Sequence, residues 1–296
     1  MLAFSRLGFV AVVLGCLACV GASGSFAASA PRVTIVSDSV GGVLFWQRDA
    51  REELALGIDL RMDIRTCRRL ATEGCVYDGA RPPSALEAIK ELGRALGAVA
   101  VVDVGYNDAP DGYGAALDRV MRALLDNGVE HVVWLTLRER RSSWADINDE
   151  IHDASKRWPQ LVVGEWDRES SGHDEWFADG IHMNWVGGAA FGRFLRPLVV
   201  QACAAACAAG GSILAVGGEL PPARLRTRYV GHLRPSGGAP PYRLTVTGLP
   251  APLRMKVDGT IYGMPKAIGA YPLQVTVLDA NGIRNRATVA LRVRRR

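Results

Sequence analysis

The segment "VTIVSDSVGG" (residues 33–42) changes character halfway along. Its first four residues are all β-branched and favour a β-strand, whereas Ser37, Asp38 and Ser39 are polar and two glycines follow Val40. A serine placed where a strand turns into a helix exposes its Oγ, and the N-terminus of that helix stabilises a developing negative charge. The same three polar side chains could instead only cap the helix. The rest of the sequence has to decide between these interpretations.

Apolar strands alternate with helical stretches along the first two thirds of the chain. The expected strands cover residues 33–38, 58–64, 97–105, 131–137 and 161–164, and the expected helices cover 43–55, 83–97, 113–128, 143–158 and 187–208. This alternation predicts a three-layer α/β/α fold with a mainly parallel, flavodoxin-like sheet. In such sheets the reactive side chains gather at the carboxyl ends of the strands.

The pattern changes near residue 210. Residues 210–222 are rich in glycine, alanine and proline and are expected to form a linker. Residues 223–296 hold short strands separated by frequent turn signals, which is typical of a small all-β sandwich. The charge changes as well: residues 211–296 carry 14 Lys and Arg and 3 Asp and Glu (14 − 3 = +11), and residues 28–210 carry 20 and 27 (20 − 27 = −7). We therefore expect an α/β domain over 31–209 and a β-sandwich domain after the linker.

The first residues have the features of a secretory signal peptide. Residues 1–27 contain one arginine, an apolar run and then small residues, which places cleavage near Ala27–Ala28. The mature protein is then expected to be secreted, periplasmic or held in the cell envelope. A second apolar run, residues 197–217, is only weakly hydrophobic and is interpreted as the closing helix and linker, so no membrane span is expected after signal removal.

Four cysteines remain once the signal peptide is removed. Cys67 and Cys75 close a short loop, and Cys203 and Cys207 lie in an alanine-rich helical run. Four cysteines allow three connectivities, and the two close pairs favour local disulfides that act as structural staples in an oxidising compartment. Without a nearby histidine these spacings are poor for zinc, so neither a metal nor another cofactor is expected.

Two further motifs stand where the predicted sheet places reactive groups. Gly105 and Asn107 follow the third strand, and Asp179 and His182 precede the last helix. A carboxylate that orients an imidazole, and an imidazole that deprotonates a serine, are two members of a catalytic triad. A glycine N–H and an asparagine amide are donors that can meet the oxyanion formed in acyl transfer. The order and placement of the three motifs favour a catalytic Ser39.

These motifs resemble those of the SGNH (GDSL-type) hydrolases, in particular their secreted bacterial branch, over roughly residues 32–200. The matching segments are Asp38–Ser39, Gly105–Asp108 and Asp179–His182. The resemblance implies a serine hydrolase that acts on carboxylic esters, with Ser39 as nucleophile, His182 as general base and Asp179 as the residue that orients His182. It also implies an oxyanion hole made of the Ser39 N–H, the Gly105 N–H and the Asn107 side chain.

Two departures from the family pattern matter. Ser37 stands where the family usually has glycine, so the turn before Ser39 must accommodate a side chain. Cys67 falls near the place of a second-block glycine whose N–H is a further oxyanion donor in the family. An N–H needs no particular side chain, so Cys67 could still donate.

The C-terminal segment has a resemblance of its own. Residues 236–294 resemble the Ig-like modules of bacterial surface proteins, which serve as spacers or adhesion units. Their excess of basic residues could hold the protein on anionic polymers of the cell envelope. Basic residues interleaved with aromatic ones are not seen, and together with export this argues against nucleic acid as a partner.

The substrate and some rival interpretations stay open at this stage. The expected substrate is a small-molecule or glycan ester of a small acyl group, such as O-acetyl on carbohydrate. The same triad could instead move an acetyl group onto an envelope glycan, or the domain could be a non-catalytic surface module with a decayed hydrolase fold. His173, Asp179 and His182 could also be metal ligands, although no further well-spaced ligand accompanies them. Trp176 and Trp185 flank the triad loop and could line an acyl or sugar pocket.

Overall fold

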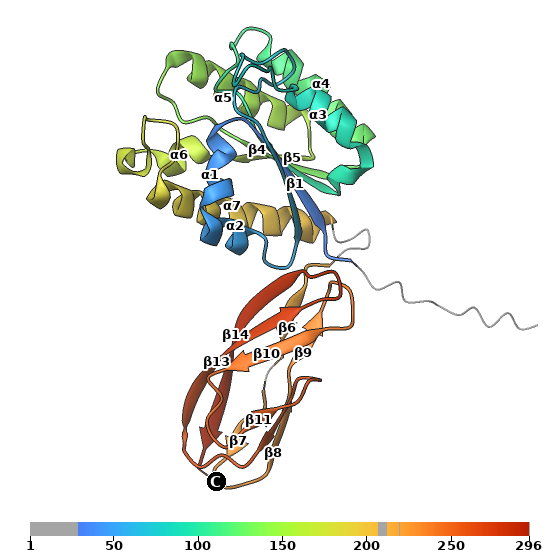
Figure 1. The fold of residues 1–296 in the computed structure, drawn as a ribbon, viewed down its shortest axis with the longest axis vertical. Helices are drawn as coiled ribbons and strands as arrows, with labels where there is room; N and C mark the ends of the chain where they lie inside the picture. The colour runs from blue at the N-terminus through green and yellow to red at the C-terminus, as the bar shows by residue number, and fades with distance from the viewer. Residues whose placement is uncertain (1–28, 207–211, 219, 296) are drawn as a thin grey trace, which may run out of the picture.

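The computed structural model describes residues 29–206, 212–218 and 220–295 as two bodies, an α/β body and a β body (Figure 1). The predicted signal peptide lies outside the described residues. So does Cys207, one half of the predicted Cys203–Cys207 bridge, whereas Cys203 is buried in the α/β core. Within the described residues, none of the helices combines the length and apolarity needed to cross a membrane.

Five parallel strands form the centre of the α/β body. They are β1 (Arg32–Ser37), β2 (Asp59–Ile64), β3 (Val99–Asp103), β4 (His131–Leu135) and β5 (Leu161–Gly164), in the spatial order β2-β1-β3-β4-β5. A parallel sheet is stable only when both faces are covered, and β3 is buried along its whole length. The chain changes direction across the sheet between β1 and β3, and such a switch point opens a crevice at the carboxyl ends of the strands.

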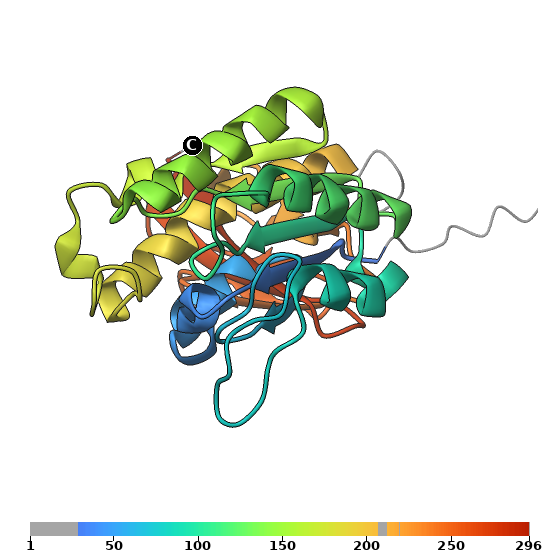
Figure 2. The same ribbon diagram turned by 90° about the horizontal axis from the view of Figure 1, so that it is seen from above.

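Helices cover both faces of the sheet (Figures 1 and 2). One layer holds α1 (Val43–Trp46), α2 (Arg48–Leu54) and α7 (Trp185–Ala206), and the other holds α3 (Ala85–Leu92), α4 (Tyr113–Asp126) and α5 (Ser142–Arg157). Shorter elements are α6 (Trp166–Ser170) and the 3-10 turns η1 (Val40–Gly42), η2 (Gly93–Leu96) and η3 (Asp174–Trp176). The predicted three-layer α/β/α fold is confirmed.

The predicted helix over 43–55 is broken at Gln47. Its backbone leaves the helical region there (φ −83°, ψ 79°), which separates α1 from α2. Gln47 is buried, and its side-chain Nε2 donates to the Trp185 carbonyl oxygen at 2.9 Å. The break therefore fastens the segment after Ser39 to the first turn of α7. No sequence pattern indicated it, because glutamine is a good helix former.

The β body is a sandwich around a second hydrophobic core. Its strands are β6 (Ala215–Gly217), β7 (Ala223–Arg224), β8 (Tyr229–His232), β9 (Arg234–Ser236), β10 (Arg243–Thr247), β11 (Arg254–Met255), β12 (Thr260–Gly263), β13 (Gly269–Leu278) and β14 (Arg284–Arg294). They form sheets of order β10-β13-β14-β7, β11-β12-β8 and β6-β9. Part of the predicted linker belongs to this body, since β6 pairs with β9 and Leu214, Val216 and Leu220 are buried in its core.

The two bodies are in contact at the end of α2. Arg284 of β14 lies 3.0 Å from the Glu52 carboxylate, and Arg286 pairs with Glu53. The Gly57 N–H donates to the Arg284 carbonyl oxygen at 2.7 Å, and a Cβ at Gly57 would come within 2.6 Å of the Leu214 carbonyl oxygen. A glycine is therefore required where the β body meets the α/β body.

Candidate active site

Ser39, His182 and Asp179 form a continuous chain of hydrogen bonds. Ser39 follows β1 and precedes η1, whereas the other two lie in the loop before α7. The Ser39 Oγ is 2.9 Å from the His182 Nε2, and the His182 Nδ1 is 2.7 Å from the Asp179 Oδ2. Residues 143 positions apart thus meet at the carboxyl edge of the sheet. This is the arrangement in which an imidazole can take a proton from a serine while a carboxylate orients it.

Hydrogen bonds within the loop that carries Asp179 and His182 hold its conformation. The Asp179 Oδ1 accepts from the backbone N–H of Ile181 at 3.2 Å and of His182 at 2.8 Å, and Gly180 adopts a φ of +97° that favours glycine. Burial raises the pKa of Asp179, but the hydrogen bonds from the His182 ring and from the two N–H groups outweigh it and lower the pKa to about 2. Asp179 is therefore ionised at neutral pH and can stabilise an imidazolium.

The turn before Ser39 accommodates the side chain of Ser37. The Ser37 Oγ donates to the Asp103 Oδ2 at 3.0 Å and accepts from the Gly41 N–H at 3.1 Å. A Cβ at Gly41 would come within 2.4 Å of that Oγ, so the glycine provides the room. Ser37 thus links β1 to β3 and to the 3-10 turn that follows Ser39. The departure from the family pattern is compatible with an ordered turn.

The Gly105 N–H does not point to an oxyanion site. It donates to the Asp38 Oδ2 at 3.3 Å, and the same carboxylate accepts from the N–H of Tyr106 at 3.3 Å and of Val40 at 3.0 Å. All these contacts are buried. Because this N–H is already used inside the protein, the predicted role of Gly105 as an oxyanion donor is not supported. Gly105 instead helps to hold the β1 turn against the end of β3.

Cys67 adopts the backbone conformation that a glycine would favour. Its φ is +65°, and it forms the predicted disulfide with Cys75, with the two Cα atoms 5.2 Å apart. In the part of the chain that the structure describes, no hydrogen bond uses the backbone N–H of Cys67 or of Ser39. Asn107 donates one N–H of its amide to the Arg68 carbonyl oxygen at 3.1 Å, and its amide has a second N–H. Three donors therefore remain that could meet an oxyanion.

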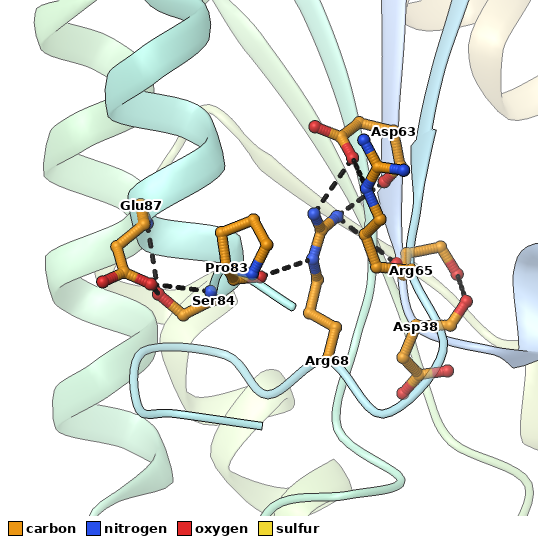
Figure 3. A network of polar contacts seen from close by, with 8 residues as sticks. Asp38, Asp63, Arg65, Arg68, Pro83, Ser84 and Glu87 are labelled. Atoms are coloured by element: carbon orange, nitrogen blue, oxygen red, sulfur yellow. Dashed lines mark hydrogen bonds and ion pairs between the residues drawn. The ribbon is translucent and has the colours of Figure 1, made fainter. Parts of the chain in front are cut away.

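The buried side chain of Arg68 holds the loop that carries Cys67 (Figure 3). Its Nη1 donates to the Asp63 carbonyl oxygen at 2.6 Å and to the Ser37 carbonyl oxygen at 3.4 Å, and its Nη2 lies 3.0 Å from the Asp63 Oδ1. Its Nε donates to the Pro83 carbonyl oxygen at 3.1 Å. The ends of β1 and β2 and the start of α3 are thereby joined through one guanidinium. Sequence reasoning missed Arg68, because an arginine beside a second arginine, Arg69, usually indicates a solvent-exposed loop.

A second tie connects this loop to the segment after β3. The Asp108 carboxylate accepts from the Leu70 N–H at 3.0 and 3.1 Å, and the Arg69 Nε donates to the Asn107 carbonyl oxygen at 2.7 Å. Burial raises the pKa of Asp108 to about 7. The backbone just after Cys67 is consequently fixed relative to the backbone at Asn107 and Asp108.

The remaining candidate residues separate into two groups. Trp176 is partly buried, and its ring stacks on Trp166 and on His173, whose Nδ1 lies 2.8 Å from Glu175. Trp185, in contrast, is exposed beside Trp46. His173 is thus engaged with Trp176 and Glu175. Throughout residues 29–206, 212–218 and 220–295, no three His, Cys, Asp or Glu side chains are grouped as metal ligands would be.

Two buried carboxyl groups beneath the Ser39 turn predict a pH-dependent stability. Burial raises the pKa of Asp103 to about 7, with a contribution from the charge of Asp38, and burial raises the pKa of Asp38 to about 6. A pKa raised by folding stabilises the native state below the unfolded pKa, near 4, and this contribution is lost as the pH rises through about 7. We expect Asp103→Asn to flatten the fall in the free energy of unfolding between pH 4.5 and 7.5, measured by urea denaturation. The exposed Asp49→Asn is the control, and an unchanged slope in Asp103→Asn would contradict the assignment.

Comparisons with known proteins found similar solved structures and one matching family model. No curated protein matches the sequence. Among solved structures, one described as a putative arylesterase from Agrobacterium tumefaciens is 14% identical, with 58% of this chain and 99% of that chain covered and a TM-score of 0.47. Another, described as a putative GDSL-like lipase from Bacteroides ovatus, is 14% identical, with 59% and 54% covered and a TM-score of 0.46.

A further solved structure and one family model each match part of the chain. A structure described as a putative alpha-galactosidase from Bacteroides fragilis is 18% identical with a TM-score of 0.24, and the match covers 27% of this chain and only 17% of that chain. Residues 223–294 match the family model described as "Putative Ig domain". The predicted Ig-like domain is therefore confirmed.

Proposed function

We propose that the protein hydrolyses carboxylic esters through an acyl-enzyme on Ser39. The observation that carries this proposal is the hydrogen-bonded chain Ser39–His182–Asp179. His182 would take the Ser39 proton while the Oγ attacks the carbonyl carbon, and it would then give that proton to the departing alcohol. Water would repeat the sequence on the acyl-enzyme and release the acid. Asp179, ionised and held by its own loop, would stabilise the imidazolium in both steps.

The oxyanion hole is proposed to consist of the Ser39 N–H, the Cys67 N–H and the Asn107 side chain. Each has a donor that no hydrogen bond among the described residues occupies. The Arg68 guanidinium and the Cys67–Cys75 disulfide would keep the Cys67 donor in place before the substrate arrives. Donors that are fixed in advance need no reorganisation in the transition state, which is why they contribute strongly to catalysis.

We further propose that the enzyme is exported and acts on esters of small acyl groups. The Cys67–Cys75 disulfide supports export to an oxidising compartment, in line with the signal peptide proposed for residues 1–27. There the enzyme would remove small acyl groups from envelope or environmental molecules. The net charge of +11 over residues 211–296 (14 basic minus 3 acidic) would hold it on anionic polymers, an attachment that added salt should weaken.

Labelling by a fluorophosphonate tests the nucleophile directly. We expect the probe to form one covalent adduct, mapped by mass spectrometry to the peptide that contains Ser39. Labelling should be absent in Ser39→Ala and strongly slowed in His182→Ala, because the base activates the serine. Ser142→Ala, which removes an exposed serine from the start of α5, should label like the wild type. An adduct on another residue, or a folded wild type that takes no label, would refute the proposed mechanism.

A further inference from the structure

Four large apolar side chains are exposed in the segments that follow Ser39 and His182. They are Phe45 (53% exposed), Trp46 (48%), Trp185 (59%) and Val186 (55%), and we call them the aromatic platform. Phe45 and Trp46 end α1, and Trp185 and Val186 begin α7. Exposing so much apolar surface in one place is unfavourable in water, and such patches commonly mark binding sites.

The aromatic platform is fixed beside the reacting atoms. One segment runs from Ser39 to Trp46 and another from His182 to Trp185, and they touch at both ends. The Ser39 Oγ and the His182 Nε2 are 2.9 Å apart, and the rings of Trp46 and Trp185 have centroids 5.9 Å apart with planes inclined by 32°. The Gln47 side chain also donates to the Trp185 carbonyl oxygen. At about 2.0 Å per residue over η1 and about 1.5 Å per residue over α1, Trp46 lies roughly 12 Å along the chain from Ser39.

The packing beneath the platform leaves it little freedom. A Cβ at Gly188 would come within 2.4 Å of the Val43 Cγ2, and one at Gly187 within 2.2 Å of the Trp176 carbonyl oxygen. Both glycines are buried in the first turn of α7. The missing side chain of Gly188 lets α7 approach α1 closely, and that of Gly187 lets α7 approach η3. The first turn of α7, which carries Trp185, is therefore closely packed against both.

The platform and the loops that carry the proposed oxyanion donors are connected to different helix layers. Cys67 and Asn107 stand on the loops that lead to α3 and α4, whereas α1 and α7 belong to the other helix layer (Figures 1 and 2). In acyl transfer the carbonyl oxygen faces the oxyanion donors, and the leaving oxygen faces the general acid. His182 is that acid, and Trp185 follows it by three residues. This arrangement favours the alcohol, rather than the acyl group, as the part of an ester that lies against the platform.

We propose that the aromatic platform is the leaving-group subsite and binds a ring-shaped alcohol by its apolar face. This inference rests on the proposed function and adds the class of substrate. Indole rings offer large, rigid apolar area at low entropic cost, and the flat face of a pyranose or an aryl ring matches it. Attack by Ser39 forms the acyl–Oγ bond and breaks the bond between the acyl carbon and the alcohol oxygen. The Ser39 proton then leaves with the ring alcohol by way of His182.

Esters that vary one part at a time test this assignment. The substrates are phenyl acetate and an acetylated methyl pyranoside as ring alcohols, ethyl acetate as an acyclic alcohol, and phenyl butyrate as a longer acyl group. We expect Trp46→Ala and Trp185→Ala each to lower kcat/KM for ring-alcohol esters by about 3- to 10-fold, as the loss of one aromatic contact implies. Ethyl acetate hydrolysis should be unchanged, Trp185→Phe should recover most of the loss, and phenyl butyrate should lose as much as phenyl acetate.

The matched control is Tyr262→Ala, which removes an exposed aromatic side chain from the β body and should change nothing. A loss confined to the pyranoside would identify a sugar alcohol, and one confined to the phenyl esters an aryl alcohol. A loss that grows with acyl length would place the acyl chain on the platform, and an equal loss on every ester would indicate a structural role. A loss seen only with an ester embedded in phosphatidylglycerol vesicles would indicate a membrane surface. Each of the last three results overturns the proposal.

A binding measurement separates this inference from the proposed function. Saturation-transfer NMR on Ser39→Ala should detect methyl glucopyranoside or benzyl alcohol but not glycerol, and Trp185→Ala added to that variant should remove the signal. If the wild type hydrolyses none of the esters, the proposed function fails. The NMR binding measurement then decides by itself whether the platform binds ring alcohols. The absence of binding by both ring alcohols would refute the platform assignment, whatever the enzyme hydrolyses.

Discussion

Replacing Ser39 with alanine is expected to lower kcat for a small soluble ester such as p-nitrophenyl acetate by about 10⁴-fold or more, with KM little changed. In the proposed mechanism the Ser39 Oγ forms the covalent bond, and the Ser37 Oγ cannot substitute for it, since it is buried and bonded to Asp103 and Gly41. The backbone donor at position 39 survives the change, so some rate enhancement over water should remain. Steady-state kinetics, with thermal unfolding to show that the variant folds, would measure this.

The proposed triad predicts that the losses of activity caused by substitutions within it are not additive. His182→Ala should cost nearly as much as Ser39→Ala, and the double variant should be no worse than the poorer single one, because the two residues act as a unit. If Ser39→Ala kept more than about a tenth of the wild-type kcat, another residue would have to be the nucleophile. Strictly multiplicative losses in the double variant would mean that Ser39 and His182 work independently, against their 2.9 Å contact.

The second large loss of activity is expected for Asn107→Ala. It should lower kcat by about 100- to 1000-fold, as removal of one oxyanion donor does in other acyl-transfer sites, and leave KM and the fold nearly intact. The structure places the Asn107 amide on the Arg68 carbonyl oxygen, which fixes the direction of its second N–H. Kinetics on the same ester used for Ser39→Ala would provide the comparison.

A matched asparagine elsewhere controls for the loss of a structural bond. Asn127→Ala removes an amide that also donates to a backbone carbonyl, that of Ala123, at the far end of α4. It should leave kcat unchanged. A variant at Asn107 that unfolds, or one that keeps full activity, would show that this amide serves only the loop.

Much of the fold could be predicted because its signals are local. Residues 33–36 are all β-branched, and β1 forms there; Ser84 and Glu87 make a capping box, and α3 begins at Ala85 (Figure 3). The positions of the candidate triad followed from the order of short motifs along the strands.

What the sequence did not reveal depends on direction and burial. The backbone angles at the end of β3 determine whether the Gly105 N–H points to a substrate or to Asp38. These angles cannot be predicted from the presence of a glycine and an asparagine. The Arg68 guanidinium is buried because carbonyl oxygens from Ser37, Asp63 and Pro83 converge on it from distant parts of the chain. These carbonyl oxygens come together only in the folded protein, so their number around Arg68 cannot be read from the sequence.

The contacts of Ser37 couple positions 37, 41 and 103, so that a substitution at one of them constrains the other two. Glycine at position 37 would leave Asp103 without its hydroxyl donor, in a place where its Oδ1 already has no partner among the described residues. A side chain at position 41 would collide with the Ser37 Oγ. A variant with glycine at position 37 should therefore be more stable with an uncharged residue at 103, and it should tolerate more than glycine at 41. A lineage could pass between the two arrangements most easily by first neutralising position 103.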